Sequence, residues 1–447
     1  MTSPAPRAAQ PQAQEPKPGL RARIAGSLSD PVLRALVTST SVSRIGHGVF
    51  LAVTVLFFTQ IIGLSAAQAA VVLAVASGCG VLASFLGGWM ADRWSARRLT
   101  FAFEAGGGLL LAAYAFAGNF VSALVLASLA GFFDTIGHSS RSAIIARGFA
   151  PDRRVHARAV LRTVTNLSIA VGSGFAAIAL AIGTAEAYRV VIAAAGLLCA
   201  VGSIPLLRLP AAVDAPPRAT DPVRTETGSI DADAVAALAA ERADWRRRSP
   251  WRDPRYLLLS ALSAVFGMQF GVAEVGVPLW ITRDTNAPTV IVSVLLITNT
   301  VLVVLFQVRA SRGTHDLRVA GRVTLIAGWL MAGACLIYAL AAGLPAWVAI
   351  IVLIAGMVAH TFAEILSQAG AWGLSFELAD PVRAGAYQGV FGVGFSLGAL
   401  ASPIVVNATA ITFGLMGWGM LALIFLASAV GIWIIARRAA AASVARA

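Results

Sequence analysis

Three ionisable residues, Asp134, His138 and Arg141, lie at positions i, i+4 and i+7 of one long apolar run. In a helix this spacing places all three side chains on one face. An ionisable side chain at the centre of a membrane helix costs about 2.5–3.5 kcal/mol on the insertion scale, so such residues are rare and usually functional. The spacing therefore predicts a polar pathway through a membrane protein. We expect the pathway to include further polar residues of the apolar runs: Arg44, His47, Glu274, His360, Glu364 and Gln368.

The chemistry that suits these residues is reversible proton binding. Burial raises the pKa of a carboxylate and a nearby arginine lowers it, so a carboxylate whose neighbours move changes its proton affinity. Asp134 with Arg44 or Arg141 meets this requirement in the first half of the chain. The alternative is that Asp134 and Arg141 form a permanent ion pair that fixes helix packing.

A second stripe lies in the other half of the chain, where His360, Glu364 and Gln368 follow at i, i+4 and i+8. Glu364 beside His360, with Glu274 across, also suits a proton carrier. This half has no arginine at that depth, so there is less reason to expect a permanent ion pair. The histidines are equally suited to hydrogen bonding between helices.

The composition indicates the elements that position these residues. The chain has 447 residues, of which 58% are hydrophobic and 12% charged, and its mean hydropathy is +0.79. Its apolar runs approach or exceed the roughly 20 residues that a helix needs to cross a bilayer, and they lack the polar alternation of a barrel. Glu104 and Glu377 fall near predicted helix ends, where water can reach them. We predict twelve membrane helices, at 33–62, 66–91, 99–118, 120–146, 158–183, 187–208, 255–282, 288–308, 321–342, 345–377, 385–407 and 412–436.

The basic residues predict the orientation of these helices. The formal net charge is +13, yet 30 of the 34 Lys and Arg residues fall in segments that twelve alternating spans place on one side. Only Arg189 and Arg283 fall on the other side. This asymmetry is the positive-inside pattern, so both termini are expected in the cytoplasm and the protein in the inner (plasma) membrane. The charge therefore indicates membrane topology and does not indicate nucleic-acid binding.

The spans divide six and six around a polar stretch. We expect a disordered cytoplasmic N-terminus (1–30), a six-helix bundle (31–208), a cytoplasmic central loop (209–253), a second bundle (254–437) and a cytoplasmic tail (438–447). Within the loop, residues 233–248 predict an amphipathic helix at the membrane surface, or alternatively a solvated linker helix. The three cysteines lie in apolar spans and are expected to be small buried hydrophobic residues, without disulfides.

A motif between the second and third predicted spans resembles a known family. From Gly88 to Arg98 the chain reads GWMADRWSARR, which is similar to the G-x-L-a-D-R-f-G-R-R signature of the major facilitator superfamily. Ser95 stands where the signature has glycine, and Ala96 replaces a basic residue. The resemblance covers about residues 33–437 and implies an all-α membrane fold of twelve helices in two six-helix bundles.

The resemblance implies a role for four residues of this loop. In the family the motif helps to latch the two halves together when the cavity faces outward, and we assign this role to Gly88, Asp92, Arg93 and Arg97. The residue types suit it, because glycine permits close helix contact and a carboxylate can cap a helix N-terminus. Ordinary positive-inside anchoring explains Arg98 but does not explain an aspartate at this place.

A second motif resembles the helix-five signature of proton-coupled exporters, G-x-x-x-G-P-x-x-G-G. The aligned residues 168–177 read SIAVGSGFAA, with Gly172 and Gly174 retained and other glycines changed to Ser or Ala. Arg162 and Asn166 precede this run on the same predicted helix. The small residues suit close helix packing and suggest an exporter.

These features together predict a secondary transporter. The sequence has no phosphate-binding GxxxxGK[ST] loop, no pair of zinc ligands and no G-x-S-x-G elbow, so we expect no catalytic site, metal or cofactor. The resemblance implies alternating access and, as partners, a small organic solute, protons and the lipid bilayer. We favour proton-coupled efflux by a monomer. The alternatives are proton-coupled uptake, a membrane-embedded enzyme and a sensor without transport.

Overall fold

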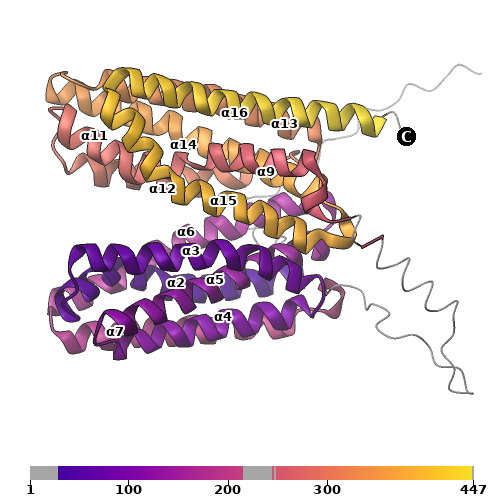
Figure 1. The fold of residues 1–447 in the computed structure, drawn as a ribbon, viewed down its shortest axis with the longest axis horizontal. Helices are drawn as coiled ribbons and strands as arrows, with labels where there is room; N and C mark the ends of the chain where they lie inside the picture. The colour runs from indigo at the N-terminus through magenta and orange to yellow at the C-terminus, as the bar shows by residue number, and fades with distance from the viewer. Residues whose placement is uncertain (1–28, 215–243, 246–247, 445–447) are drawn as a thin grey trace, which may run out of the picture.

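The computed structural model describes residues 29–214, 244–245 and 248–444. Figure 1 shows two groups of roughly parallel helices stacked on each other, one from the first half of the chain and one from the second. The groups converge at the end where the chain's C-terminus lies and diverge at the other end. Residues 1–28 of the predicted disordered N-terminus and most of the predicted amphipathic helix in 233–248 lie outside the described residues.

The first half begins its helices at polar caps. Asp30, Ser65, Ser95, Asn119 and Thr184 each accept a hydrogen bond from a backbone N–H of the following first turn, which satisfies donors that have no partner within the helix. The helices are α2 (Pro31–Leu56), α3 (Ala66–Ala91), α4 (Ala96–Ala113), α5 (Phe120–Gly148), α6 (Pro151–Ile182) and α7 (Ala185–Gly202).

The second half contains two irregular helices. Pro278 has no N–H to donate to the carbonyl of Glu274, and a π-helical turn, η6 (Val272–Gly276), precedes it; such an interruption is a usual cause of a helix distortion. A second π-helical turn, η8 (Asn407–Ile411), separates the last two helices. The helices are α9 (Pro254–Gly267), α10 (Gln269–Gly271), α11 (Val277–Asp284), α12 (Ile291–Ala310), α13 (Leu317–Leu340), α14 (Ala346–Glu377), α15 (Ala384–Val406) and α16 (Thr412–Val444).

Helices lie at each of the twelve predicted ranges, and nine helical stretches in the described residues are long and apolar enough to cross a membrane. The last stretch, Pro381–Ser443, covers both α15 and α16. Two predicted ends differ most from the structure. Helix α6 begins seven residues before predicted position 158, because Pro151 suits the first helical turn. Helix α16 continues to Val444, beyond the predicted end at 436, through an alanine-rich sequence that favours helix.

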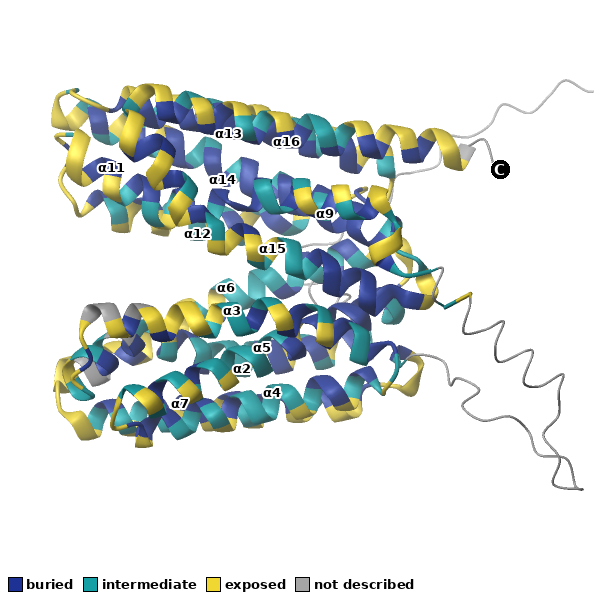
Figure 2. Ribbon diagram, viewed as in Figure 1, coloured by how far each residue is buried: buried dark blue, intermediate teal, exposed yellow. Residues whose placement is uncertain are grey.

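Buried apolar side chains show how the halves meet. One cluster includes Leu36 and Ala146 from the first half together with Tyr387 and Ile435 from the second. Two further clusters each belong to one half alone. Figure 2 shows buried residues on both groups of helices where they converge, and exposed residues at the tips of the diverging helices. The molecule is therefore closed between its halves at one end.

The closed end carries the α3–α4, α5–α6 and α14–α15 connections, and we call it the arginine-rich end. Close backbone contact is possible there because Gly88 of α3 lies against the carbonyl oxygen of Gly385, where a Cβ atom would collide with backbone. Small residues of this kind let helices approach closely. This packing fixes α3 against α15 across the two halves.

Candidate functional site

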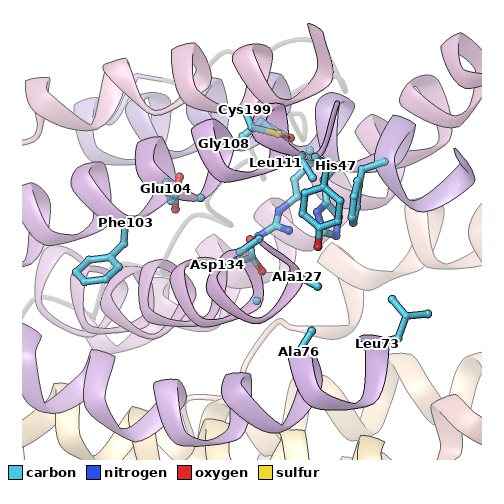
Figure 3. A pocket seen from close by; sticks show the side chains of 17 residues that line it. His47, Leu73, Ala76, Phe103, Glu104, Gly108, Leu111, Ala127, Asp134 and Cys199 are labelled. Atoms are coloured by element: carbon cyan, nitrogen blue, oxygen red, sulfur yellow. Dashed lines mark hydrogen bonds and ion pairs between the residues drawn. The ribbon is translucent and has the colours of Figure 1, made fainter. Parts of the chain in front are cut away.

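Two cavities lie between the halves. The inner cavity has a volume of about 330 Å³ and lies nearer the arginine-rich end. The outer cavity has a volume of about 290 Å³ and lies nearer the diverging end. Arg162 of α6 lines both. A third space of about 170 Å³, the bundle pocket, lies within the first half and is shown in Figure 3.

An ion pair joins the halves beside both cavities. The Arg162 guanidinium lies 2.5 Å from the Glu364 carboxylate, linking α6 to α14. The carboxylate also accepts hydrogen bonds from Asn299 at 2.9 Å and Gln368 at 3.4 Å. Glu364 is only 4% exposed. Among the described residues, this pair is the hydrogen-bonded link between the halves that lies farthest from the arginine-rich end.

Arg44, one of the two predicted partners of Asp134, forms an ion pair with it. Arg44 of α2 lies 3.5 Å from the Asp134 carboxylate of α5, and the aspartate side chain is 50% exposed. Both residues line the inner cavity and the bundle pocket. Figure 3 shows Asp134, His47 and Glu104 around the bundle pocket. The pair thus separates a space within one half from the cavity between the halves.

The alternative pairing of Asp134 with Arg141 is wrong. Arg141 is paired instead with Glu104 of α4, at 2.6 Å, and also donates hydrogen bonds to the hydroxyls of Ser39 and Thr40. The expectation that Glu104 lies near a helix end is also wrong, and its side chain is 11% exposed. Helix α4 begins at Ala96, so Glu104 lies about 12 Å along it.

The remaining predicted residues divide between the cavities and the interior. His138 and Gln368 line the inner cavity, and Glu274 lines the outer one. His360 lines none of these spaces: it is buried inside the second half, with Nδ1 at 3.4 Å from the Tyr338 hydroxyl. Among the described residues the Glu364 carboxylate is hydrogen-bonded to Arg162, Asn299 and Gln368, and not to His360.

Arg158 is a cavity residue that the sequence analysis missed. It lines the inner cavity, donates to Gln388 Oε1 at 3.2 Å, and lies 5.3 Å from the Trp372 ring centre. Position 158 is the predicted start of a membrane span, where an arginine suggests an anchor at the membrane surface. The available signal was its spacing, since Arg158 and Arg162 are one helical turn apart on α6.

The loop motif contacts the second half through Asp92. Its carboxylate accepts hydrogen bonds from the backbone N–H groups of Gly385 at 2.8 Å and Ala386 at 2.7 Å, and it pairs with Arg147. A carboxylate at the first turn of α15 is favoured by the helix dipole. Burial raises the pKa of the Asp92 carboxyl, and Arg147 and the two N–H groups partly oppose this effect.

The two arginines of the motif contact the central loop. Arg93 lies over the Trp89 ring at 3.8 Å and lies 5.7 Å from the Trp245 ring centre. Arg97 donates to Asp214 at 3.1 Å, and so holds the start of the central loop against α4. Gly88 and Asp92 thus contact the second bundle.

The residues of the helix-five motif lie on α6, which is the fifth predicted span, and they face different neighbours. Gly172 packs against the backbone of Ile45 in α2, whereas a Cβ on Gly174 would have no neighbour within 4 Å. Asn166 lines the outer cavity, one turn from Arg162. The described residues include no group of three or more His, Cys, Asp or Glu side chains that could hold a metal ion, and the three cysteines are free thiols.

Comparison with solved structures shows the same fold. The human organic anion transporter MFSD10 (TETRAN) matches with a TM-score of 0.65 and 16% identity, over 90% of this chain and 99% of that one. A bacterial homologue of the iron transporter ferroportin, in an outward-facing state, matches with a TM-score of 0.67 and 13% identity, over 91% and 98%. The proton:xylose symporter XylE bound to 6-bromo-6-deoxy-D-glucose matches with a TM-score of 0.65 and 12% identity, over 92% and 96%.

Comparison by sequence gives the family. No curated protein sequence matches the chain. The family model of the major facilitator superfamily matches residues 36–403, which is most of the chain. The chain therefore belongs to the major facilitator superfamily.

Proposed function

We propose that this protein is a proton-coupled secondary transporter that exports a small, drug-like organic solute or metabolite across the inner (plasma) membrane as a monomer. The observation that carries the proposal is the Arg162–Glu364 ion pair, which joins the two halves beside both cavities. Alternating access requires contacts that hold one end closed and release when a ligand binds. An ion pair with a titratable partner is such a contact.

Protonation of Glu364 is the releasing step. With the arginine-rich end in the cytoplasm, as the positive-inside pattern predicts, the structure faces outward. A proton that reaches Glu364 through the outer cavity removes the charge that holds Arg162. Removing one partner of a buried ion pair costs about 3–5 kcal/mol. The protonated protein therefore favours opening of the arginine-rich end toward the cytoplasm.

The return step carries the solute. In the inward-facing state Glu364 releases its proton to the cytoplasm, and the ionised carboxylate again attracts Arg162 as the halves close. A solute bound from the cytoplasm moves outward in this step. Each proton that crosses a potential of 100 mV supplies about 2.3 kcal/mol for the cycle. Asp134, with Arg44 as its partner, is a second proton carrier on the same cavity wall.

One observation favours uptake by proton symport as a second function. Arg158 faces the inner cavity without a carboxylate partner among the described residues. An anionic solute held by Arg158 and by Arg162, once Glu364 is protonated, would travel in the same direction as the proton. Export and uptake therefore differ in whether the solute and the proton bind together or exclude each other.

The test measures the conformational response to pH. Spin labels on Gly118→Cys and Ala342→Cys, in a variant whose native cysteines are replaced by serine, report the distance between the halves at the diverging end. We expect this distance to shorten as the pH falls. Glu364→Gln, which imitates the protonated state, should give the short distance at every pH, and Glu186→Gln on the exposed start of α7 is the matched control.

Flux measurements complete the test. Purified protein in liposomes with an imposed pH gradient should move a solute from a panel of organic cations and anions, and the flux should collapse with the gradient. A Glu364→Gln variant that keeps the parental pH response and the parental flux would contradict the proposed role of this carboxylate.

A further inference from the structure

We propose that the outer cavity is a binding site for a compact aromatic ammonium ion, with Glu274 as its counter-ion. The assignment rests on the proposed function in one respect: the ammonium ion is the solute that competes with the proton in the proposed transport cycle. Its physical basis is the distribution of charge along the two cavities, which leaves one carboxylate without a positive partner.

Most ionisable residues along the seam are paired. Three ion pairs are present: Arg44 with Asp134, Arg141 with Glu104, and Arg162 with Glu364. Among the described residues that line the inner or outer cavity, the charged side chains outside these pairs are Arg158 and Glu274. Arg158 therefore leaves a positive charge in the inner cavity, and Glu274 leaves a negative charge in the outer cavity.

These two charges differ in how the protein stabilises them. Arg158 donates to Gln388 and lies beside the rings of Trp372 and Phe376, at 5.3 and 5.6 Å, and such cation–π contacts stabilise a guanidinium. Glu274 is exposed to the cavity and has no ion pair or side-chain hydrogen bond among the described residues. Glu274 is therefore the charge that a ligand would neutralise.

The walls of the outer cavity suit an aromatic or aliphatic ammonium ion. Phe270, Leu296 and Met357 supply apolar and polarisable surface, while Asn166 and Thr300 supply a few polar groups. Ligand sites are commonly apolar clefts with a small number of placed polar groups. An ammonium ion gains the attraction of the Glu274 carboxylate, and its apolar part gains contact with these side chains; the Phe270 ring also lies 5.3 Å from the Arg162 guanidinium. The cavity volume of about 290 Å³ fits a molecule with a single ring.

The location of Glu274 links this site to proton movement. Glu274 and Glu364 line the same cavity, where two carboxylates face one arginine. A cation bound at Glu274 neutralises the excess negative charge that would otherwise attract a proton into this cavity. The cation and the proton therefore exclude each other, which is the relation that exchange of one for the other requires.

The probe is phenyltrimethylammonium, and the comparison compounds have nearly the same shape. tert-Butylbenzene is its neutral isostere, and benzenesulfonate is a similar anion. Equilibrium binding to the purified full chain is measured at pH 8, without a membrane gradient. We expect the parent to bind the cation at least about tenfold more tightly than the neutral isostere, because an unpaired carboxylate in a partly apolar cavity attracts a cation strongly.

Variants assign the binding to Glu274. Glu274→Gln should remove the preference for the cation, Glu274→Asp should keep part of it, and Glu186→Gln should leave it unchanged. Because Glu274 is exposed, Glu274→Gln is expected to fold, and an unchanged melting temperature checks this. Equal affinity of the cation for parent and Glu274→Gln, tighter binding of benzenesulfonate, or no binding of the cation would each overturn the assignment.

The result is separable from the test of the proposed function. Binding is measured without a gradient, and the pH response is measured without a solute. If the cation fails to bind while Glu364→Gln abolishes the pH response, the substrate assignment falls and the proton coupling stands. If the cation binds at Glu274 while the pH response is absent, the coupling falls and the site stands.

Discussion

The backbone N–H of Gly385 donates a hydrogen bond to the Asp92 carboxylate at 2.8 Å, across the boundary between the two halves of the molecule. Replacing Asp92 by Asn removes the charge that the first turn of α15 and Arg147 attract. A carboxylate charge at a helix N-terminus contributes about 0.3–1 kcal/mol, and up to about 2 kcal/mol where it is partly buried, so we expect Asp92→Asn to shift the halves toward closure at the diverging end by up to about tenfold. The distance between the labelled Gly118→Cys and Ala342→Cys positions measures this shift.

Asp316→Asn is the control for that variant. Asp316 caps α13 in the corresponding loop of the second half and accepts from the backbone N–H groups of Arg318 and Val319, both within its own half. Its replacement should weaken one helix end without changing the balance between the two conformations. An equal shift in both variants would show that capping alone, and not the link between the halves, is being measured.

The contact between α3 and α15 has a test that does not involve charge. A Cβ atom at Gly88 would collide with the backbone of Gly385, whereas one at Gly78 of the same helix would meet nothing within 4 Å. We therefore expect Gly88→Ala to separate the halves at the arginine-rich end and Gly78→Ala to have no effect. Spin labels at Trp94→Cys and Val382→Cys, both exposed at this end, report the separation. Parental distances in Gly88→Ala would contradict the packing.

A double-mutant cycle tests the Arg162–Glu364 pair as an interaction. Arg162→Gln or Glu364→Gln alone leaves a largely buried charge without its partner, which costs about 3–5 kcal/mol. The double variant leaves neither charge. We expect its loss of stability to be smaller than the sum of the single losses. Additive losses, measured by thermal unfolding at pH 8, would show that the two side chains do not interact.

The Glu104–Arg141 pair is expected to act on stability and not on gating. Both side chains are mostly buried inside the first half, at 11% and 8% exposure. Glu104→Gln should lower the free energy of unfolding by about 3–5 kcal/mol, whereas Glu186→Gln should change it by less than about 0.5 kcal/mol. The pH response of the distance between the halves should persist in Glu104→Gln. Loss of that response would place Glu104 among the proton carriers.

The helices could be predicted from the sequence because hydrophobicity and length alone determine which segments enter a bilayer. The ionisable residues of the polar pathway could also be identified from the sequence, because ionisable residues are rare within apolar segments. The start of α6 was placed too late, because Arg153, Arg154 and Arg158 lower the hydropathy of its first turns. Helix formation there follows from Pro151 and from good helix formers, which hydropathy does not measure.

The partners of the ionisable residues could not be predicted from spacing. Asp134 and Arg141 share one helix, and their spacing suggested a pair, but Arg141 meets Glu104 from α4. Sequence spacing relates Glu364 only to residues of its own helix, whereas Arg162 reaches it from the other half. Such contacts depend on how the two bundles are packed together, and a single sequence contains no measure of that packing.

The π-helical turn η6, which ends two residues before Pro278, affects how this protein can be compared with relatives. A widened turn accommodates one residue more than a regular turn, and each residue of a helix corresponds to a rotation of about 100°. The side chains of α11 are therefore out of phase with those of α9. For a relative whose helix is regular at this place, an ungapped alignment would assign the wrong face to the positions beyond Gly276, so such a sequence needs a gap there before its lining residues are compared.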